Sequence, residues 1–357
     1  MGLVLALAAG LWALGWLFKA PVWARVGMVG LLLAGVILAQ LGLPDGHPFR
    51  AATGGNAQNW VLLIGAAALV LGYRALLGRL RMRAAARVIP TQAKERTMAD
   101  RPAGTFGSEE LERYARHIML REIGGPGQKA LKNARVLVIG AGGLGSPALL
   151  YLAAAGVGTI GVVDDDVVDN SNLQRQVIHA HERIGTPKVA SAEQAMRALN
   201  PHIEVEAHQL RLEAANAEAL FAGYDLVLDG SDNFDTRYLT NRTAAKLGIP
   251  LIAAAITQWE GQISLYDPAH GTPCYECIFP ARPAPGLVPS CAEAGVVAPL
   301  PGVIGAMMAL EAVKHITGAG QTLKGEMLVY DGLWSETRKF TLEKRADCPV
   351  CGGMGQG

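Results

Sequence analysis

Long apolar runs fill the first 80 positions of the chain, at residues 3–18, 26–43 and 60–77, and none contains an acidic residue. At 1.5 Å per residue of helix, the 18 residues of the second run reach about 27 Å, close to the roughly 30 Å hydrocarbon core of a bilayer. The first run has 16 residues. A cleaved signal peptide is its alternative, although no Lys or Arg precedes it. We therefore predict a membrane region over residues 1–83 with a bundle of about three transmembrane helices.

The pattern changes after a predicted linker at residues 84–107, which contains Pro, Gly and scattered charges. Short runs typical of buried strands then alternate with segments of helical length. The strand-like runs are 135–139, 158–163, 203–207, 226–228 and 250–255, and the helical segments between them are 147–155, 188–199 and 236–247. This alternation predicts an α/β fold over residues 108–352, a Rossmann-like, mostly parallel sheet with helices on both faces. Ser108 is the predicted N-cap of a helix that precedes it, and residues 353–357 are a tail.

Charge is divided between the two parts of the chain. Residues 1–80 carry five basic and one acidic side chains, and the rest of the chain carries 27 basic and 30 acidic ones. Neither part has the strong positive charge that favours binding to a phosphate backbone, so we expect no nucleic-acid partner.

The basic residues in and around the predicted membrane region indicate its orientation in the bilayer. Lys19 and Arg25 separate the first two runs, four Arg residues follow the third within ten positions, and the loop at 44–59 has one Arg against one Asp. By the positive-inside rule, everything after residue 80 is cytoplasmic. We therefore predict a multi-pass protein of the inner (cytoplasmic) membrane, with its predicted α/β domain in the cytoplasm.

A glycine-rich segment follows the first strand-like run of the body. Gly140, Gly142, Gly143 and Gly145 permit a tight turn and a close approach of backbone amides to a phosphate. Asp164 follows the next strand, 19 residues after the last of these glycines, where a carboxylate can accept hydrogen bonds from a ribose. The default interpretation is an NAD-dependent oxidoreductase, and a turn without a ligand is the simpler one.

Further candidate nucleotide-binding residues lie in the loops that come next. They are Asp166, Ser171, Asn172, Leu173, Gln174, Arg175, Lys188, Asp232 and Asn233. Two cations can hold phosphate oxygens while an acid holds Mg²⁺, so Arg175, Lys188 and Asp232 suit a triphosphate such as ATP. From spacing alone, NAD and a triphosphate stay open.

Four of the five cysteines form two CxxC pairs, Cys274 with Cys277 and Cys348 with Cys351. Two such pairs supply four thiolates to a closed, tetrahedral and therefore structural Zn²⁺ site. The fifth, Cys291, follows a segment rich in Pro and Ala. It is either a small buried hydrophobe or an exposed nucleophile on a flexible loop.

Several of these motifs together resemble one known family. They are residues 113–117, the glycine-rich segment, residues 171–176, Pro187-Lys188, Asp232-Asn233, the two CxxC pairs and residues 294–299. The resemblance is to the ThiF/MoeB/HesA family of ubiquitin-activating-type adenylyltransferases, over about residues 108–352. It implies an enzyme that uses ATP and Mg²⁺ to adenylate the C-terminal glycine carboxylate of a ubiquitin-like sulfur carrier ending in Gly-Gly, with release of pyrophosphate. The membrane region lies outside the family pattern.

The resemblance also implies a role for each phosphate-side candidate. Arg175 and Lys188 would neutralise phosphate oxygens, because the difficulty lies in bringing a carboxylate onto a polyanion. Asn172 would hydrogen-bond to the phosphates, and Asp232 would hold Mg²⁺.

Other residues are carried over in the same way. Gly143 and Asp164 would seat the ATP. Arg116 corresponds to an arginine-finger-like residue that the neighbouring subunit supplies, which implies a homodimer. Cys291 falls where the thiamine branch of the family keeps a thiol that can bond to the carrier, and the four paired cysteines match the family's structural zinc site.

The identity of the carrier is less closely specified. Residues 293–302 are similar to the molybdopterin-synthase branch, which favours the small subunit of molybdopterin synthase, whereas residues 164–166 and 348–352 are equally similar to the thiamine branch. No rhodanese-like segment follows, so we expect a separate sulfur donor. The alternatives from other classes are a membrane-tethered NAD oxidoreductase and a non-catalytic zinc-bearing scaffold.

Overall fold

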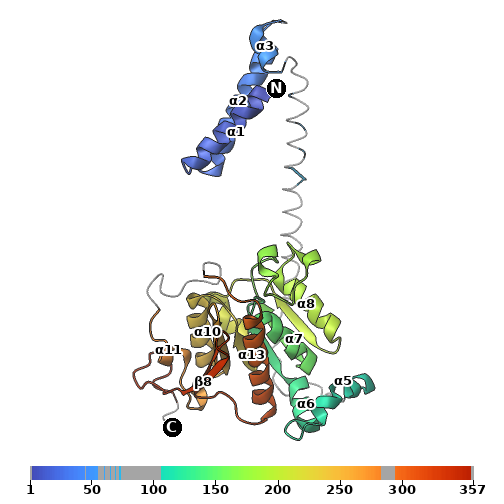
Figure 1. Cartoon of the computed structure of the whole chain (residues 1–357), viewed down its shortest axis with the longest axis vertical. Helices are drawn as coiled ribbons and strands as arrows, with labels where there is room; N and C mark the ends of the chain where they lie inside the picture. The colour runs from blue at the N-terminus through green and yellow to red at the C-terminus, as the bar shows by residue number, and fades with distance from the viewer. Residues whose placement is uncertain are drawn as a thin grey trace. The chain divides into compact units, whose positions relative to one another are not determined.

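The computed structural model describes residues 2–44, 46–54, 60, 65, 69, 72, 73, 106–282 and 294–354. The chain divides into two compact units, Met1–Lys94 and Glu95–Gly357 (Figure 1). The division falls inside the predicted linker, most of which lies outside the described residues.

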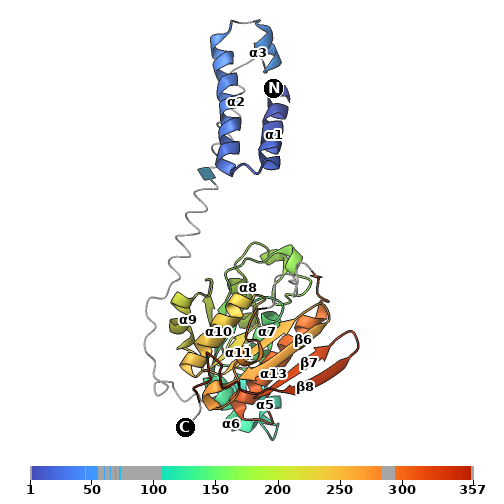
Figure 2. The same cartoon turned by 90° about the vertical axis from the view of Figure 1, so that its left-hand side faces the viewer.

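The N-terminal unit contains helices α1 (Gly2–Leu17), α2 (Val22–Gly42) and α3 (Pro48–Ala52). The first two form a hairpin in which Val4 and Val36 are buried in one small apolar cluster (Figure 2). Most other side chains on both helices are exposed, although their sequences are strongly apolar.

Within the described residues, one helix is long and apolar enough to cross a membrane. It lies in α2, over Ala24–Gly42, with a mean hydropathy of 1.9. Helix α1 forms where the first predicted span lies, but with 16 residues it is shorter than that length criterion. The third predicted span lies mostly outside the described residues. A bundle of three membrane helices is therefore still a prediction.

The C-terminal unit alternates helices and strands along most of its length. Its helices are α5 (Ser108–Ile118), α6 (Gly124–Asn133), α7 (Gly145–Ala155), α8 (Lys188–Leu199), α9 (Ala214–Phe221), α10 (Phe234–Leu247), α11 (Tyr275–Ile278) and α13 (Pro299–Thr317), with 3₁₀ turns η2 (Asn170–Asn172), η3 (His181–Arg183) and η4 (Pro268–His270). Its strands are β1 (Arg135–Ile139), β2 (Thr159–Val163), β3 (Glu204–His208), β4 (Leu226–Asp229), β5 (Leu251–Ile256), β6 (Glu260–Tyr266), β7 (Glu326–Asp331) and β8 (Glu336–Thr341).

The eight strands form one sheet in the order β3-β2-β1-β4-β5-β6-β7-β8. Strands β1 to β5 pair in parallel, which confirms the Rossmann-like part of the prediction. Strands β6, β7 and β8 extend the sheet with antiparallel pairs, so the sheet is mixed. These three strands were not predicted from the sequence. Strand β8 shows no apolar alternation because it is an exposed edge strand, where charged side chains discourage pairing with another chain.

Helices cover both faces of this sheet, as predicted. In β1, Val136 and Val138 pack into one core with α7, α8 and α13, while Leu137 and Ile139 pack into a second core with α9, α10 and α11. Strands buried on both faces are continuously apolar, which is why the central strands could be located from sequence.

The first helix of the C-terminal unit begins one residue earlier than its predicted cap implies. Gly107, not Ser108, is the N-cap of α5, and its backbone N–H donates to Glu110 Oε2 at 3.0 Å. The Glu110 carboxylate at the third helical position therefore accepts the backbone N–H of the cap residue, which is the glutamate half of a capping box.

Candidate functional site

The predicted nucleotide-binding residues gather where parallel strands β1, β2 and β4 end. The backbone N–H of Gly140 donates to the carbonyl of Val163 at 2.8 Å, and that of Gly230 donates to the carbonyl of Ile139 at 3.0 Å. The strand order reverses between β1 and β4, and in open α/β sheets ligands bind at this switch point.

The glycine loop, residues 140–145, joins β1 to α7. Gly140 has φ +91°, which favours glycine, and a Cβ on Gly145 would lie 1.9 Å from the Gly140 carbonyl oxygen. Gly142 and Gly143 lie in the turn between them. Glycine is therefore required at positions 140 and 145 by the turn itself. The Ser146 N–H at the start of α7 donates to the Gly142 carbonyl at 2.9 Å, and a phosphate bound by this loop would lie at the N-terminus of the helix.

Asp164 holds this loop. Its Oδ2 accepts the N–H of Ala141 at 2.8 Å, and its Oδ1 accepts the N–H of Asp166 at 2.9 Å. Burial raises the pKa of Asp164 above its ordinary value, and the positive charge of Lys188 opposes that shift. The predicted contact with a ribose is untested.

Lys188 begins α8 with only 6% of its side chain exposed. Its Nζ donates to Asp166 Oδ2 at 2.7 Å, and its backbone N–H donates to the Asp166 carbonyl at 3.0 Å. Asp166, predicted to bind the nucleotide, is thus the partner that orients the lysine. A buried cation with an exposed counter-ion can exchange that partner for a phosphate with little further desolvation.

The segment 171–176 carries the second predicted cation. Asn172 Oδ1 accepts from Arg175 Nη2 at 3.1 Å and from Gln176 Nε2 at 3.2 Å, so these three side chains form one cluster. Ser171 Oγ donates to Asp169 Oδ1 at 2.6 Å, which directs that hydroxyl to its own turn.

The two remaining predicted residues of this segment, Leu173 and Gln174, are half-buried and exposed, respectively.

Asp232 and Asn233 follow β4 and play different structural parts. Asn233 is the N-cap of α10, where its Oδ1 accepts the N–H of Thr236 at 2.9 Å. Asp232 is exposed, and its carboxylate has no hydrogen bond or ion pair with another residue in the part of the chain that is described. It is therefore available to a cation.

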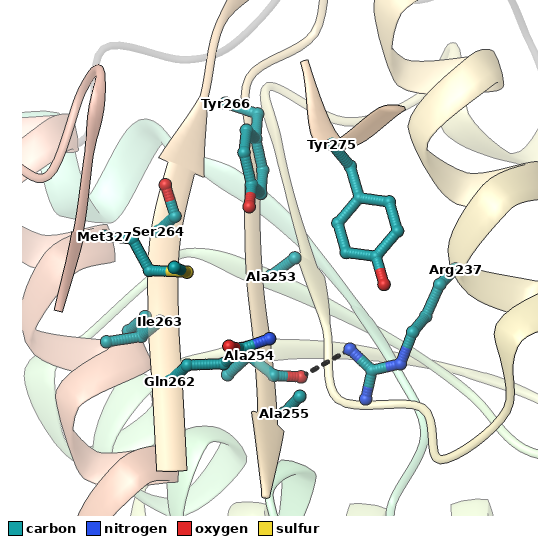
Figure 3. Close-up of a pocket in the computed structure, with 10 residues that line it drawn as sticks. All are labelled: Arg237, Ala253, Ala254, Ala255, Gln262, Ile263, Ser264, Tyr266, Tyr275 and Met327. Carbon is teal, nitrogen blue, oxygen red and sulfur yellow. Dashed lines mark hydrogen bonds between the residues drawn. The ribbon is translucent and has the colours of Figure 1, made fainter. Parts of the chain in front are cut away.

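Arg237 fixes the loop that carries Asp232, a role that the sequence analysis missed. This buried guanidinium donates from Nη1 to the Ala254 carbonyl at 2.7 Å (Figure 3). It also donates from Nη2 to the Ser231 carbonyl. With Tyr266 and Tyr275 it lines a cavity of about 10 Å³, room for about one water molecule. Its place near the start of the predicted helical segment 236–247 was the available signal.

Arg116 lies far from the glycine loop of its own chain. It is exposed in the last turn of α5, which lies with α6 at one end of the body (Figure 1). Asn200, just after α8, donates to the hydroxyl of Tyr114 in α5 at 2.8 Å. Helices α7 and α8 begin at the site and run about 16–18 Å to the ends where α5 packs.

The four paired cysteines come together, as predicted. Their side chains are buried, with Sγ separations of 3.6 Å for Cys274–Cys348 and 3.4 Å for Cys277–Cys351. Zn–S bonds of about 2.3 Å at tetrahedral angles place sulfurs about 3.8 Å apart, so the donor set fits one closed zinc site.

The site is supported from α10. Asn241 Oδ1 accepts the N–H of Tyr275 at 2.9 Å, and Arg242 forms two bonds to the buried carboxylate of Glu276 at 2.8 and 3.0 Å. Burial raises the pKa of the Cys274 thiol above its ordinary value, and a cation is what would hold four thiolates in this position. Cys291 lies outside the described residues, so its predicted role is untested.

The fold and this site define a nucleotide-binding protein of the Rossmann class with a four-cysteine cluster. The chain belongs to the ThiF family, whose model matches residues 114–350. It is 51% identical to the sulfur carrier protein adenylyltransferase of Thermus thermophilus, over 68% of this chain and 92% of that protein.

One further relative agrees with this assignment, and one solved structure agrees with the fold. The chain is 52% identical to the probable adenylyltransferase/sulfurtransferase MoeZ of Mycobacterium tuberculosis, over 70% of this chain and 64% of that protein. The crystal structure of E. coli MccB with ATP is similar in fold, with a TM-score of 0.60 and 24% identity, over 69% of this chain and 75% of that one.

We predict that Cys348→Ser lowers zinc content and melting temperature together, because structural zinc binding contributes directly to the free energy of folding. Elemental analysis of the wild type should find one zinc per chain, and differential scanning calorimetry should detect the loss of stability. Thr337→Ser, at an exposed position of β8, is the control. A Cys348→Ser protein with full zinc occupancy would refute the four-ligand site.

Proposed function

We propose that this protein uses ATP and Mg²⁺ to adenylate the C-terminal glycine carboxylate of a ubiquitin-like sulfur carrier that ends in Gly-Gly. The observation that carries the proposal is that two cations and one acid lie on segments that adjoin the glycine loop. Arg175 lies beside Gly143, Lys188 is connected to the loop through Asp166 and Asp164, and Asp232 follows Gly230, which lies against Gly140. The relative at 51% identity, named as a sulfur carrier protein adenylyltransferase, supports the same reaction.

The reaction needs charge stabilisation more than proton transfer. A C-terminal carboxyl group with a pKa of about 3.5 is already ionised at neutral pH, so no general base is required. A carboxylate oxygen forms a bond to the α-phosphorus of ATP, and the bond from that phosphorus to pyrophosphate breaks. Arg175 and Lys188 would offset the negative charge on the phosphates, and Asp232 would bind Mg²⁺.

A homodimer is part of the proposal. Arg116 belongs to α5, which packs near the C-terminal ends of α7 and α8, whereas the glycine loop of the same chain lies at the N-terminus of α7. As an arginine finger it would have to enter the site of a second subunit, which agrees with the role that the family resemblance implies.

The small subunit of molybdopterin synthase is our proposed carrier, and the thiamine-pathway carrier is the alternative. A separate sulfur donor and a role for Cys291 in sulfur transfer remain predictions. NAD-dependent oxidoreduction is less well supported, because hydride transfer makes no use of the exposed Asp232 as a metal ligand. Zinc at the four-cysteine cluster is proposed as structural, since its four thiolates leave no open position.

We also propose that the N-terminal unit anchors the enzyme to the cytoplasmic membrane, with the catalytic unit in the cytoplasm. Helix α2 supports this, because an apolar helix of that length with few buried side chains is suited to lipid. Lys19 and Arg25 flank the turn between α1 and α2, where the positive-inside rule places them in the cytoplasm.

We predict that the full-length protein exchanges labelled pyrophosphate into ATP only when a Gly-Gly carrier is present. Arg175→Ala or Lys188→Ala should each lower the exchange rate on the order of 10³-fold, as loss of a phosphate-facing cation does in phosphoryl transfer. Arg197→Ala, in the last turn of α8 and paired with Glu193, is the matched control and should exchange normally.

Exchange without a carrier would contradict the proposed substrate. Near-wild-type exchange in both the Arg175→Ala and Lys188→Ala proteins would remove their assigned roles, provided that calorimetry shows both variants to be folded.

We predict the topology by labelling single cysteines at Gly2, Ala52 and Glu95 in a chain that lacks native thiols. Polar backbone enters hydrocarbon only as helix, so each apolar run inserts whole or stays out. External labelling at residues 2 and 52 alone corresponds to three spans, and labelling at 52 alone corresponds to a two-span hairpin. External labelling at residue 95 would overturn the cytoplasmic placement.

A further inference from the structure

His179 lies between the glycine loop and α8, and the reaction as described above gives it no role. Its imidazole is 7% exposed. Nε2 is 2.9 Å from the carbonyl oxygen of Ala141, and Nδ1 is 2.9 Å from the hydroxyl of Ser191. Each ring nitrogen therefore lies within hydrogen-bond distance of one partner, Nε2 with the glycine loop and Nδ1 with α8.

The partners determine the tautomer. A carbonyl oxygen can only accept, so Nε2 carries the proton and donates to Ala141. Nδ1 then accepts, and the Ser191 hydroxyl donates to it. Burial lowers the pKa of His179, and the positive charges of Lys188 and Arg183 act in the same direction, while the hydrogen bond to Ala141 opposes them. A lowered pKa favours the neutral ring, which is the form in which Nδ1 accepts from Ser191.

With the hydrogen bond from His179, both backbone polar groups of Ala141 in the glycine loop have a partner. The Ala141 N–H is bound by Asp164 at 2.8 Å, and its carbonyl is bound by His179. The peptide groups on both sides of Ala141 thus have fixed orientations, which sets where the following amides point.

The other nitrogen connects the loop to α8. Ser191 lies three residues after Lys188, so the two side chains are neighbours on one face of the helix. One imidazole therefore links the loop that would cradle the phosphates to the helix that supplies a phosphate-binding cation.

We propose that His179 is a positioning residue that holds the glycine loop in register with Lys188 for ATP binding. The proposal rests on the proposed ATP site but not on adenylation of any carrier. A role in core packing alone would depend on the volume of the ring, whereas the positioning role depends on the donor at Nε2 and on Ser191.

Three substitutions and one control distinguish these roles. His179→Gln keeps a donor near the Nε2 position, His179→Leu fills the space without one, and Ser191→Ala removes the link to α8. His181→Gln changes an exposed histidine two residues away and is the matched control.

The measurement is the affinity of the full-length protein for ATP with Mg²⁺ and no carrier, by isothermal titration calorimetry. His179→Leu should weaken binding roughly tenfold or more, because it leaves a buried carbonyl of the loop without its donor. His179→Gln should stay within about threefold of the wild type, and Ser191→Ala should fall between them. In exchange assays, KM for ATP should rise in the same order while KM for the carrier stays constant.

Wild-type ATP affinity in a folded His179→Leu protein, with only a lower melting temperature, would reduce the residue to core packing. Equal losses in the Leu and Gln variants would overturn the role of the donor. If His179→Leu does not fold, the ATP affinity of the Ser191→Ala protein tests the proposal instead. An unchanged ATP affinity in that protein would refute the link to α8. A wild type that binds ATP but never exchanges pyrophosphate would contradict the proposed function and leave this inference standing.

Discussion

The hydrogen bond between the Ala141 N–H and the Asp164 carboxylate organises the candidate site of this protein. It connects the segments that follow β1 and β2 and holds the glycine loop at the carboxyl ends of these strands. From Asp164 the contacts continue through the Asp166 N–H to the Asp166 carboxylate, which holds the Lys188 ammonium at 2.7 Å. The glycine loop and a buried cation are therefore positioned by one short run of acidic residues.

Buried strands and spaced motifs could be predicted from sequence because their physical requirements are local. Strand β1 lies where its apolar run predicts, since a strand covered by helices on both faces has to be apolar throughout. Gly140 is predictable because its φ of +91° favours glycine, and the paired cysteines are predictable because four thiolates at those spacings suit one metal. These signals depend little on the rest of the fold.

Features that depend on distant neighbours were not predictable. Strand β8 has an exposed, charged sequence, and its place is specified by pairing with β7. His179 and Arg237 resemble ordinary surface residues in sequence, and only the folded chain brings them to the carbonyls of Ala141 and Ala254. The contact of Asp166 with Lys188 likewise depends on the fold, because it joins the loop after β2 to the start of α8.

Transfer of an adenylyl group from ATP to a carrier carboxylate changes the mass of the carrier. The most direct test is therefore the intact mass of the carrier after incubation with the full-length protein, ATP and Mg²⁺. Rapid quenching in acid followed by mass spectrometry should find the carrier heavier by one adenylyl group. A carrier that lacks its last glycine should stay unmodified, as should the full carrier incubated with the Lys188→Ala protein. An unmodified full carrier, or equal modification of the truncated one, would contradict the account.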